Sequence, residues 1–367
     1  MEEMSITTVV GLAGFLAGVV FGGVANKTNF CTMGAISDIV FMDDYARFRS
    51  WLLAIAVAII GSQTLHVTGI VNLYESIYQT SNLGWLGGII GGLIFGFGMT
   101  MTGGCANKNL VRIGGGNLKS IVVVIVMAIF AYMTLRGLIG LARVEIESFS
   151  NIDLTRIGLK SQGMIDILAL LVGSEAENLR IGFTAVVVGC LLVYCFSDAR
   201  FRASPVNICG GIIIGAMVPL GWWLTGVLGF DDFEPTDLFS FTFVSPAGDS
   251  IQYLMTYTGA TINFGIATVG GVIVGSFLMA KISGSFHIEA FNDKEDMVRH
   301  LFGAAIMGIG GVLALGCTVG QGITGMSTLA LGSVIALASI IVGALIGFKY
   351  LEEGTIAGTF KAIIKNN

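Results

Sequence analysis

Charged residues are scarce in this chain of 367 residues: Asp, Glu, Lys and Arg together make up 12% of it, and proline occurs only 4 times. The formal net charge is −5, and no basic run is present. A nucleic-acid partner or a polybasic lipid-binding patch is therefore not expected. The scarcity of charge also leaves no segment polar enough to form a separate soluble domain.

Cysteine pairs are absent as well. The six cysteines show no Cys-x-x-Cys spacing and lack the histidine partners of a zinc site, so we expect no structural metal and no cofactor. They fall in or beside apolar segments, which argues against a secreted disulfide framework. No Cys-His pairing is apparent, and we expect a protein that is not an enzyme. Cys190 and Cys195 lie in the helical context "GCLLVYC" and are interpreted as small core residues.

Apolar residues are abundant: 54% of the chain is hydrophobic, and 53 residues are glycine. Apolar runs of about 18 or more residues, the length that crosses a bilayer as a helix, recur along the whole sequence. The first run follows "MEEM", which carries acids where a signal peptide would carry Lys or Arg, so we interpret it as a retained span. The sequence therefore predicts an all-α, polytopic helix bundle in the inner (plasma) membrane.

The hydrophobic pattern predicts helices over residues 5–24, 51–70, 83–103, 118–142, 164–173, 181–196, 206–229, 251–281, 299–316 and 326–350. Several are short, interrupted by glycine and followed by polar residues, which is typical of re-entrant half-helices inside a protein-lined cavity. "DDYARFRS" and "DKEDMVRH" carry Lys or Arg and favour the cytoplasmic side, whereas "VNLYESIYQTSN" carries neither. The number of crossings and the side of each terminus stay open.

An internal repeat is written into the chain. "GFGMTMTGGC", ending at Cys105, aligns with "GIGGVLALGC", ending at Cys317, so that Gly96 falls on Gly308 and Gly98 on Gly310. "NFC" at 29–31 and "NIC" at 207–209 share a fainter Asn-x-Cys pattern. Repeats with glycine-broken helices predict a transport fold of two halves, residues 1–160 and 161–367, with a site at their interface near the membrane midplane.

Four cysteines, Cys31, Cys105, Cys209 and Cys317, sit at polar breaks and are candidates for a substrate path. Lys108 and Arg112 follow Cys105 one helical turn apart, where a charge at membrane depth favours an anionic ligand; the alternative is that both side chains reach the membrane interface. Thiols are soft, weak donors, which suit a polarizable sulfur or selenium anion that must also leave again. A thiol-disulfide redox protein and a scaffold with merely small cysteines are the alternatives.

Three stretches, "NKTNFCTMGAISD", "GGLIFGFGMTMTGGCANKNLVRIGGG" and "GIGGVLALGCTVGQG", resemble the YeeE/YedE family of membrane proteins. The resemblance implies uptake of thiosulfate or a related sulfur compound, with selenium compounds in some branches. It also implies a pinched, inverted-repeat fold whose path carries cysteines at Cys31, Cys105 and Cys317, whereas Cys209 rests on the repeat alone. A soluble sulfur carrier of the TusA type is an expected partner, and no such domain is fused here.

Overall fold

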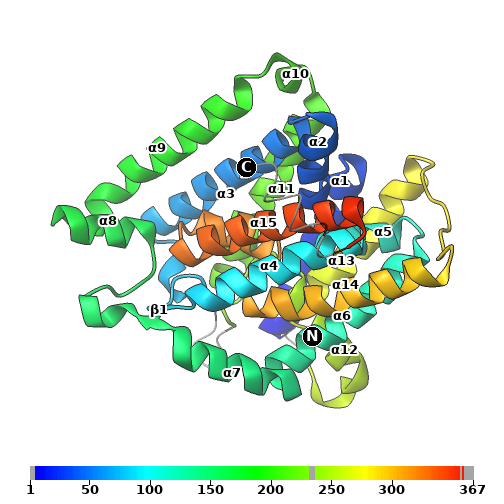
Figure 1. Ribbon diagram of the computed structural model, residues 1–367. Helices are drawn as coiled ribbons and strands as arrows, with labels where there is room; N and C mark the ends of the chain where they lie inside the picture. The colour runs from blue at the N-terminus through cyan, green and yellow to red at the C-terminus, as the bar shows by residue number, and fades with distance from the viewer. Residues whose placement is uncertain (1–4, 231–235, 356–357, 359–367) are drawn as a thin grey trace.

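The computed structural model describes residues 5–230, 236–355 and 358, and helices dominate it (Figure 1). The α-helices are α1 (Ile6–Lys27), α2 (Thr32–Met42), α3 (Ala46–Val67), α4 (Trp85–Met101), α5 (Ala106–Gly114), α6 (Leu118–Arg136), α7 (Leu138–Ser150), α8 (Met164–Val172), α9 (Ala176–Phe196), α10 (Ala199–Arg202), α11 (Pro205–Trp223), α12 (Val244–Met255), α13 (Phe264–Ile282), α14 (Lys294–Leu313) and α15 (Leu331–Glu353).

Smaller elements connect these helices. Two π-helical segments are η3 (Leu224–Leu228) and η5 (Gly320–Gly325), and three 3-10 turns are η1 (Leu73–Glu75), η2 (Leu154–Ile157) and η4 (Tyr257–Gly259). The short strands β1 (Asn82–Leu83) and β2 (Ile152–Asp153) pair antiparallel, with Asn82 opposite Asp153. They tie the segment before α4 to the segment after α7.

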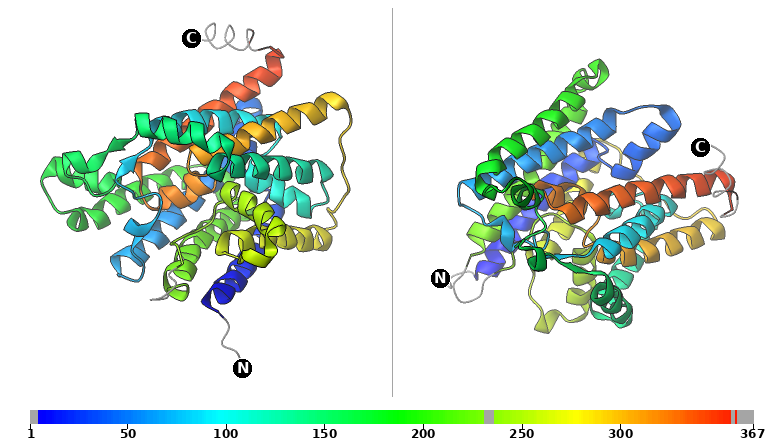
Figure 2. Two further views of the ribbon diagram at one scale, coloured as in Figure 1. Left: turned by 90° about the horizontal axis from the view of Figure 1, so that it is seen from below. Right: turned by 60° about the vertical axis from the view of Figure 1, so that its left-hand side comes forward.

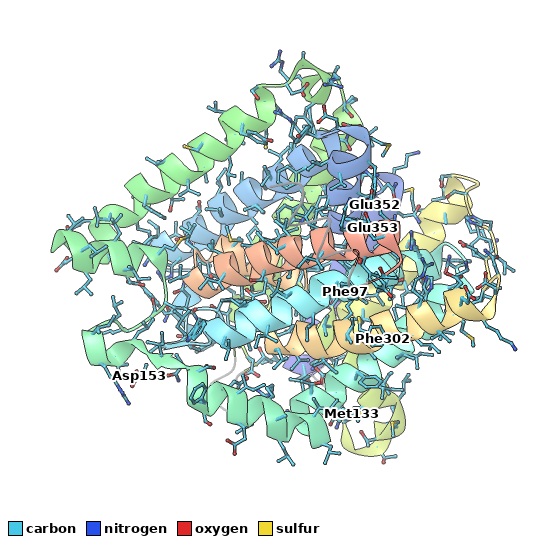
Figure 3. The ribbon with its side chains drawn as sticks, viewed as in Figure 1. Phe97, Met133, Asp153, Phe302, Glu352 and Glu353 are labelled. Atoms are coloured by element: carbon cyan, nitrogen blue, oxygen red, sulfur yellow. The ribbon has the colours of Figure 1, made fainter. Side chains whose placement is uncertain are left out.

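The helices form a membrane bundle. Among the described residues, 9 segments are long and apolar enough to cross a bilayer. Large apolar side chains cover the outer surface, such as Phe302 of α14, which is 57% exposed (Figure 3). Such side chains would cost free energy in water but not against lipid tails. The prediction of an all-α, multi-pass membrane protein is thus confirmed.

Two predicted helices differ from the structure. The helix predicted over residues 118–142 is interrupted at Gly137, because α6 ends at Arg136 and α7 begins at Leu138. Residues 251–281 do not form a single helix, because the chain leaves α12 after Met255 and starts α13 only at Phe264. The Asn263 side chain accepts a hydrogen bond from the Ile266 backbone N–H at 2.9 Å and so begins the new helix. The break makes α12 a short helix, as α2 and α5 are.

The helices pack in two matching sets. α1 packs on α13 as α11 packs on α3, and α4 packs on α15 as α14 packs on α6. α11 begins beside Thr28, where α1 has ended, and the chain after α11 returns to Val10 near the start of α1, so the two helices run in opposite directions. The matching sets are therefore inverted. The division at residues 160 and 161 stays a prediction. In the sequence, α7 to α10 lie between the two sets.

Glycine lets the two sets meet at the crossing of α4 and α14. A β-carbon on Gly98 would lie 2.7 Å from the Gly303 carbonyl oxygen, and one on Gly310 would lie 2.6 Å from that of Gly91. The two contacts are equivalent, because the repeat aligns Gly98 with Gly310. The same alignment places Gly91 on Gly303. Close backbone approach of this kind is typical of helix packing in membranes.

The bundle has two ends. α1 begins at one end and α15 finishes at the other, as the left view of Figure 2 shows. α1 and α4 end, and α6 and α14 begin, on the side where α15 finishes. In Figure 1, α9 runs along one edge of the bundle and α7 lies at the opposite edge. The centre, where the short helices meet, is thus enclosed by the long ones.

Candidate functional site

Cys31 lies at the break between α1 and α2. Asn29 takes a left-handed backbone conformation (φ 53°), a conformation that asparagine tolerates better than most residues, and the chain turns there. Cys31 then stands at the N-terminal cap of α2, and its Sγ accepts a hydrogen bond from the Gly34 backbone N–H at 3.4 Å. The thiol is buried, with 5% of the residue exposed. The break therefore holds this sulfur at a helix N-terminus inside the bundle.

Cys105 lies at the matching break between α4 and α5. Gly103 has a φ of +66°, which glycine adopts without the steric cost of a β-carbon, and the turn releases Cys105 as the cap residue of α5. Cys105 is also buried. Its thiol lies near the thiol of Cys31. Two cysteines separated by 74 positions in the sequence thus lie close together where two helices begin.

Cys317 lies at the third break, after α14. Leu315 is left-handed (φ 57°), and Gly320 of η5 donates its backbone N–H to the Cys317 Sγ at 3.4 Å. The neighbouring Thr318 side chain lies against the Cys105 thiol. Cys317 is 0% exposed. The three buried cysteines therefore gather in the protein interior: Cys31 lies near Cys105, and Thr318, the neighbour of Cys317, also lies near Cys105.

Lys108 and Arg112 lie on the side of this thiol cluster where α4 ends. Both line a cavity of about 540 Å³ between the ends of α1 and α4 and the beginnings of α6 and α14, here called the cationic vestibule. Lys108 donates to the Asn29 side-chain oxygen. Within residues 5–230, 236–355 and 358, Arg112 has no side-chain hydrogen bond or ion pair, and Lys108 has no carboxylate partner.

The other charges of the cationic vestibule compensate one another. Lys119 pairs with Glu289 at 3.3 Å and with Asp296 at 3.1 Å, and Arg299 pairs with Asp296 at 2.7 Å. The field that remains in the cavity therefore comes from Lys108 and Arg112. The N-termini of α2 and α5, which begin next to Cys31 and Cys105, add partial positive charge near these thiols.

The remaining cysteines lie elsewhere. Cys209 is exposed on α11, unlike the three buried thiols, and its place in a path stays a prediction. Cys195 is buried, as expected of a core residue. Cys190 is exposed, so the expectation that it packs in the core is wrong. The reason is the position of α9 at the edge of the bundle, where little protein covers it.

Sequence reasoning missed two residues near the thiols. The Thr242 Oγ1 lies 4.0 Å from the Cys317 Sγ. The Arg47 guanidinium pairs with Asp38 and lies over Gly34, beside the backbone that holds Cys31. A signal for the first existed: "FTFVSPAGD" from 241 to 249 has Phe and Asp at the same positions as "FCTMGAISD" from 30 to 38. The Asn-x-Cys pattern shared by residues 29–31 and 207–209 indicated Cys209 instead.

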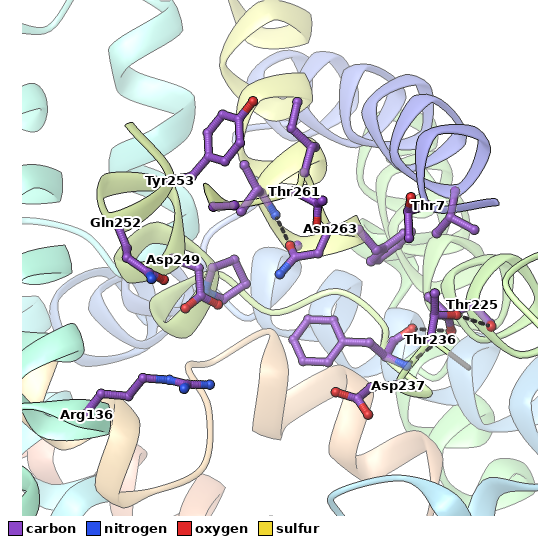
Figure 4. A pocket seen from close by; sticks show the side chains of 18 residues that line it. Thr7, Arg136, Thr225, Thr236, Asp237, Asp249, Gln252, Tyr253, Thr261 and Asn263 are labelled. Carbon is purple, nitrogen blue, oxygen red and sulfur yellow. Dashed lines mark hydrogen bonds between the residues drawn. The ribbon is translucent and has the colours of Figure 1, made fainter. Parts of the chain in front are cut away.

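A second cavity of about 400 Å³ lies toward the end where α1 begins (Figure 4). No cysteine lines it. Arg136 of α6 and Asp249 of α12 lie on one side of it and Asn263 on another, as the close view shows. Burial raises the pKa of Asp249, and the charge of Arg136 opposes the rise. This cavity is separate from the cationic vestibule and shares no lining residue with it.

Comparison with known proteins places the chain in a family. A family model described as sulphur transport matches residues 27–346. The chain is similar to the thiosulfate transporter TsuA of Escherichia coli (strain K12), with 27% identity over 324 residues, covering 85% of this chain and 86% of the relative. It is also similar to the thiosulfate transporter TsuA of Spirochaeta thermophila, with 24% identity over 341 residues, covering 90% and 96%. The chain belongs to the sulphur transport family.

Proposed function

We propose that this protein is a thiosulfate transporter, not an enzyme, and that the anion passes along the thiols of Cys31, Cys105 and Cys317. The observation that carries the proposal is the cluster of three buried thiols beside two cations that no carboxylate of the described residues neutralises. Family membership and the two relatives named for thiosulfate support the substrate.

The chemistry of the site fits an anion with a terminal sulfur. A neutral S–H group is a weak donor, and sulfur is polarizable, so a thiol holds a soft anion without trapping it. Conduction needs sites of this kind, which bind well enough for entry and weakly enough for exit. Lys108 and Arg112 would raise the local anion concentration before the narrow part of the path. The anion moves without forming a covalent bond to the protein.

Uptake of radiolabelled thiosulfate into liposomes that contain the purified protein tests the proposal. We expect Cys105→Ala to lower the initial rate at least about tenfold, equivalent to about 1.4 kcal/mol of barrier, because the central contact is lost. Cys190→Ala, at an exposed thiol of α9, is the matched control and should transport like the wild type. Equal uptake by both variants would contradict the proposal.

A second candidate function is thiol-disulfide redox chemistry, which the proximity of Cys31 and Cys105 favours. Closing a disulfide between them would release two protons and pass two electrons to an acceptor such as a membrane quinone. Counting alkylatable thiols after treatment with a quinone distinguishes the two functions. A paired loss of two thiols that a reductant reverses, together with uptake unaffected by Cys105→Ala, would favour the redox function.

Three further expectations belong to the same proposal. The protein would work in the inner membrane, would have a soluble TusA-like sulfur carrier as a partner, and would discriminate between thiosulfate and selenium compounds at the thiols. Cys209 would take part in the path only if Cys209→Ala lowers uptake. Competition between thiosulfate and selenosulfate in the liposome assay measures the discrimination directly.

A further inference from the structure

The inverted repeat assigns a counterpart to each thiol of the path. Cys105 and Cys317 follow α4 and α14, which cross at glycines of equal spacing. Cys31 follows α1 and precedes the short α2. The residues that follow α11 and precede the short α12 are the counterpart of this break, and there the alignment of "FCTMGAISD" with "FTFVSPAGD" places Thr242 opposite Cys31.

The contacts of Thr242 agree with this assignment. Cys31 lies near the cysteine of its own half, Cys105. Thr242 lies 4.0 Å from the cysteine of the other half, Cys317, which is its one side-chain hydrogen-bonding contact among the described residues. Its burial is close to that of Cys31, with 5% exposed in each case. The second half of the cluster therefore carries a hydroxyl where the first half carries a thiol.

Tyr78 brings a second hydroxyl to the same point. A β-carbon on Gly320 would lie 2.4 Å from the Thr242 Oγ1 and 3.5 Å from the Tyr78 hydroxyl, so both oxygens converge on this glycine. Tyr78 is 4% exposed and packs edge-on against Trp222. Its hydroxyl makes no hydrogen bond to any residue that the structure describes and is thus free to donate to a ligand.

The Tyr78 side chain lines a recess of about 20 Å³, whose lining residues include Gln321 and Ser333 and no charged residue. This volume holds about one water molecule or one oxygen atom of a ligand. The Ser333 Oγ, which can donate to such an oxygen, is buried and has no hydrogen-bond partner among the described residues. Burial raises the pKa of Tyr78, so its hydroxyl stays a neutral donor at physiological pH.

We propose that Thr242 and Tyr78 form an oxygen-binding station of the path, next to Cys317, that takes the oxygen atoms of an oxyanion while the thiols take its terminal sulfur. The proposal rests on the proposed function and extends it to substrate class: the passenger must present oxygen and sulfur together. Hydroxyls are stronger donors than thiols and match oxygen acceptors. Thr242 and Tyr78 are then specificity-determining residues.

Competition in the liposome assay tests this station. Sulfate has oxygen atoms but no terminal sulfur, and thiocyanate has a sulfur atom but no oxygen. We expect Tyr78→Phe and Thr242→Val to weaken inhibition by sulfate several-fold and to leave inhibition by thiocyanate unchanged. Cys31→Ala should do the reverse. Thr242→Ser, which keeps the hydroxyl, should retain more of the inhibition by sulfate than Thr242→Val does. Cys190→Ala, at an exposed thiol outside the path, is the control and should behave like the wild type.

The outcomes separate this proposal from the proposed function. Wild-type liposomes that fail to take up thiosulfate would overturn the proposed function itself. Wild-type uptake with Tyr78→Phe and Thr242→Val unchanged in both inhibitions, or weakened equally in both, would overturn the oxygen-binding station alone. If Thr242→Val does not fold, Thr242→Cys carries the same test, since it replaces the hydroxyl with a thiol and should shift inhibition from sulfate toward thiocyanate.

Discussion

The two halves of the thiol cluster share a backbone frame but carry different side chains. The half at α2 and α5 has two neighbouring thiols, and Lys108 and Arg112 of α5, which no described carboxylate pairs with, line a cavity of about 540 Å³. The half at α12 and η5 has one thiol, the Thr242 hydroxyl and an uncharged recess of about 20 Å³. This difference indicates that the half at α2 and α5 attracts anions by charge, whereas the half at α12 and η5 selects among them through hydrogen bonds from uncharged groups.

The largest effect should come from breaking the frame that both halves share. In Gly98→Val the new β-carbon would lie 2.7 Å from the Gly303 carbonyl oxygen. This is too close, so α4 and α14 must separate. Overpacking of this kind costs about 1–3 kcal/mol. Thermal melting in detergent should show a clearly lower Tm, with uptake lost as well. Gly189→Val on α9, where nothing lies within 4 Å, is the control, and equal melting of the two variants would count against the close crossing.

The next effect concerns the charged half alone. Arg112→Gln and Lys108→Gln remove the two cations that no carboxylate of the described residues neutralises, and each should raise the KM for thiosulfate about tenfold, or about 1.4 kcal/mol. The effect should shrink as salt increases, because salt screens the field in the cavity. Arg156→Gln, at an 84% exposed site, should leave the KM unchanged. An unchanged KM in both vestibule variants would contradict the role of Lys108 and Arg112 in attracting the anion.

A smaller effect should follow from making the halves alike. Cys31→Thr gives the first half the hydroxyl of the second, so both breaks then present a threonine next to a cysteine. Transport should continue at a rate several-fold lower, since one soft contact becomes a hard one. The initial rates of Cys31→Thr and Cys31→Ala measure this. If the threonine variant is as slow as the alanine variant, the two breaks are not interchangeable.

The smallest effect lies outside the path, at Asp249. Its pKa is raised in the folded protein by burial, so ionisation opposes folding. This free-energy cost is absent below the unfolded-state pKa of Asp249. It grows as the pH rises between the unfolded-state and folded-state pKa values, and it is complete above the folded-state pKa. Asp249→Asn should therefore raise the Tm at pH 7, with a gain that vanishes near pH 4. Asp198→Asn is the opposite case, because backbone N–H bonding lowers the pKa of Asp198, and it should lower the Tm at pH 7.

Much of this architecture was predictable from sequence, because a bilayer constrains helix length and apolar content so strongly. The alignment of Cys105 with Cys317 also held in space, since the glycines that align in sequence are those that the crossing of α4 and α14 requires. The counterpart of Cys31 was missed because a threonine replaces the cysteine there. The proximity of Cys31 and Cys105 was likewise beyond reach, because it depends on how two distant breaks pack.

The most direct test of the central claim is a crystal structure with selenosulfate, in which selenium takes the place of the terminal sulfur. The anomalous signal of selenium locates that end of the anion independently of the oxygens. We predict a selenium peak in contact with the Sγ atoms of Cys31 and Cys105 or of Cys317. A bound anion whose selenium points away from all three sulfurs, with its oxygens toward the thiols, would contradict the account.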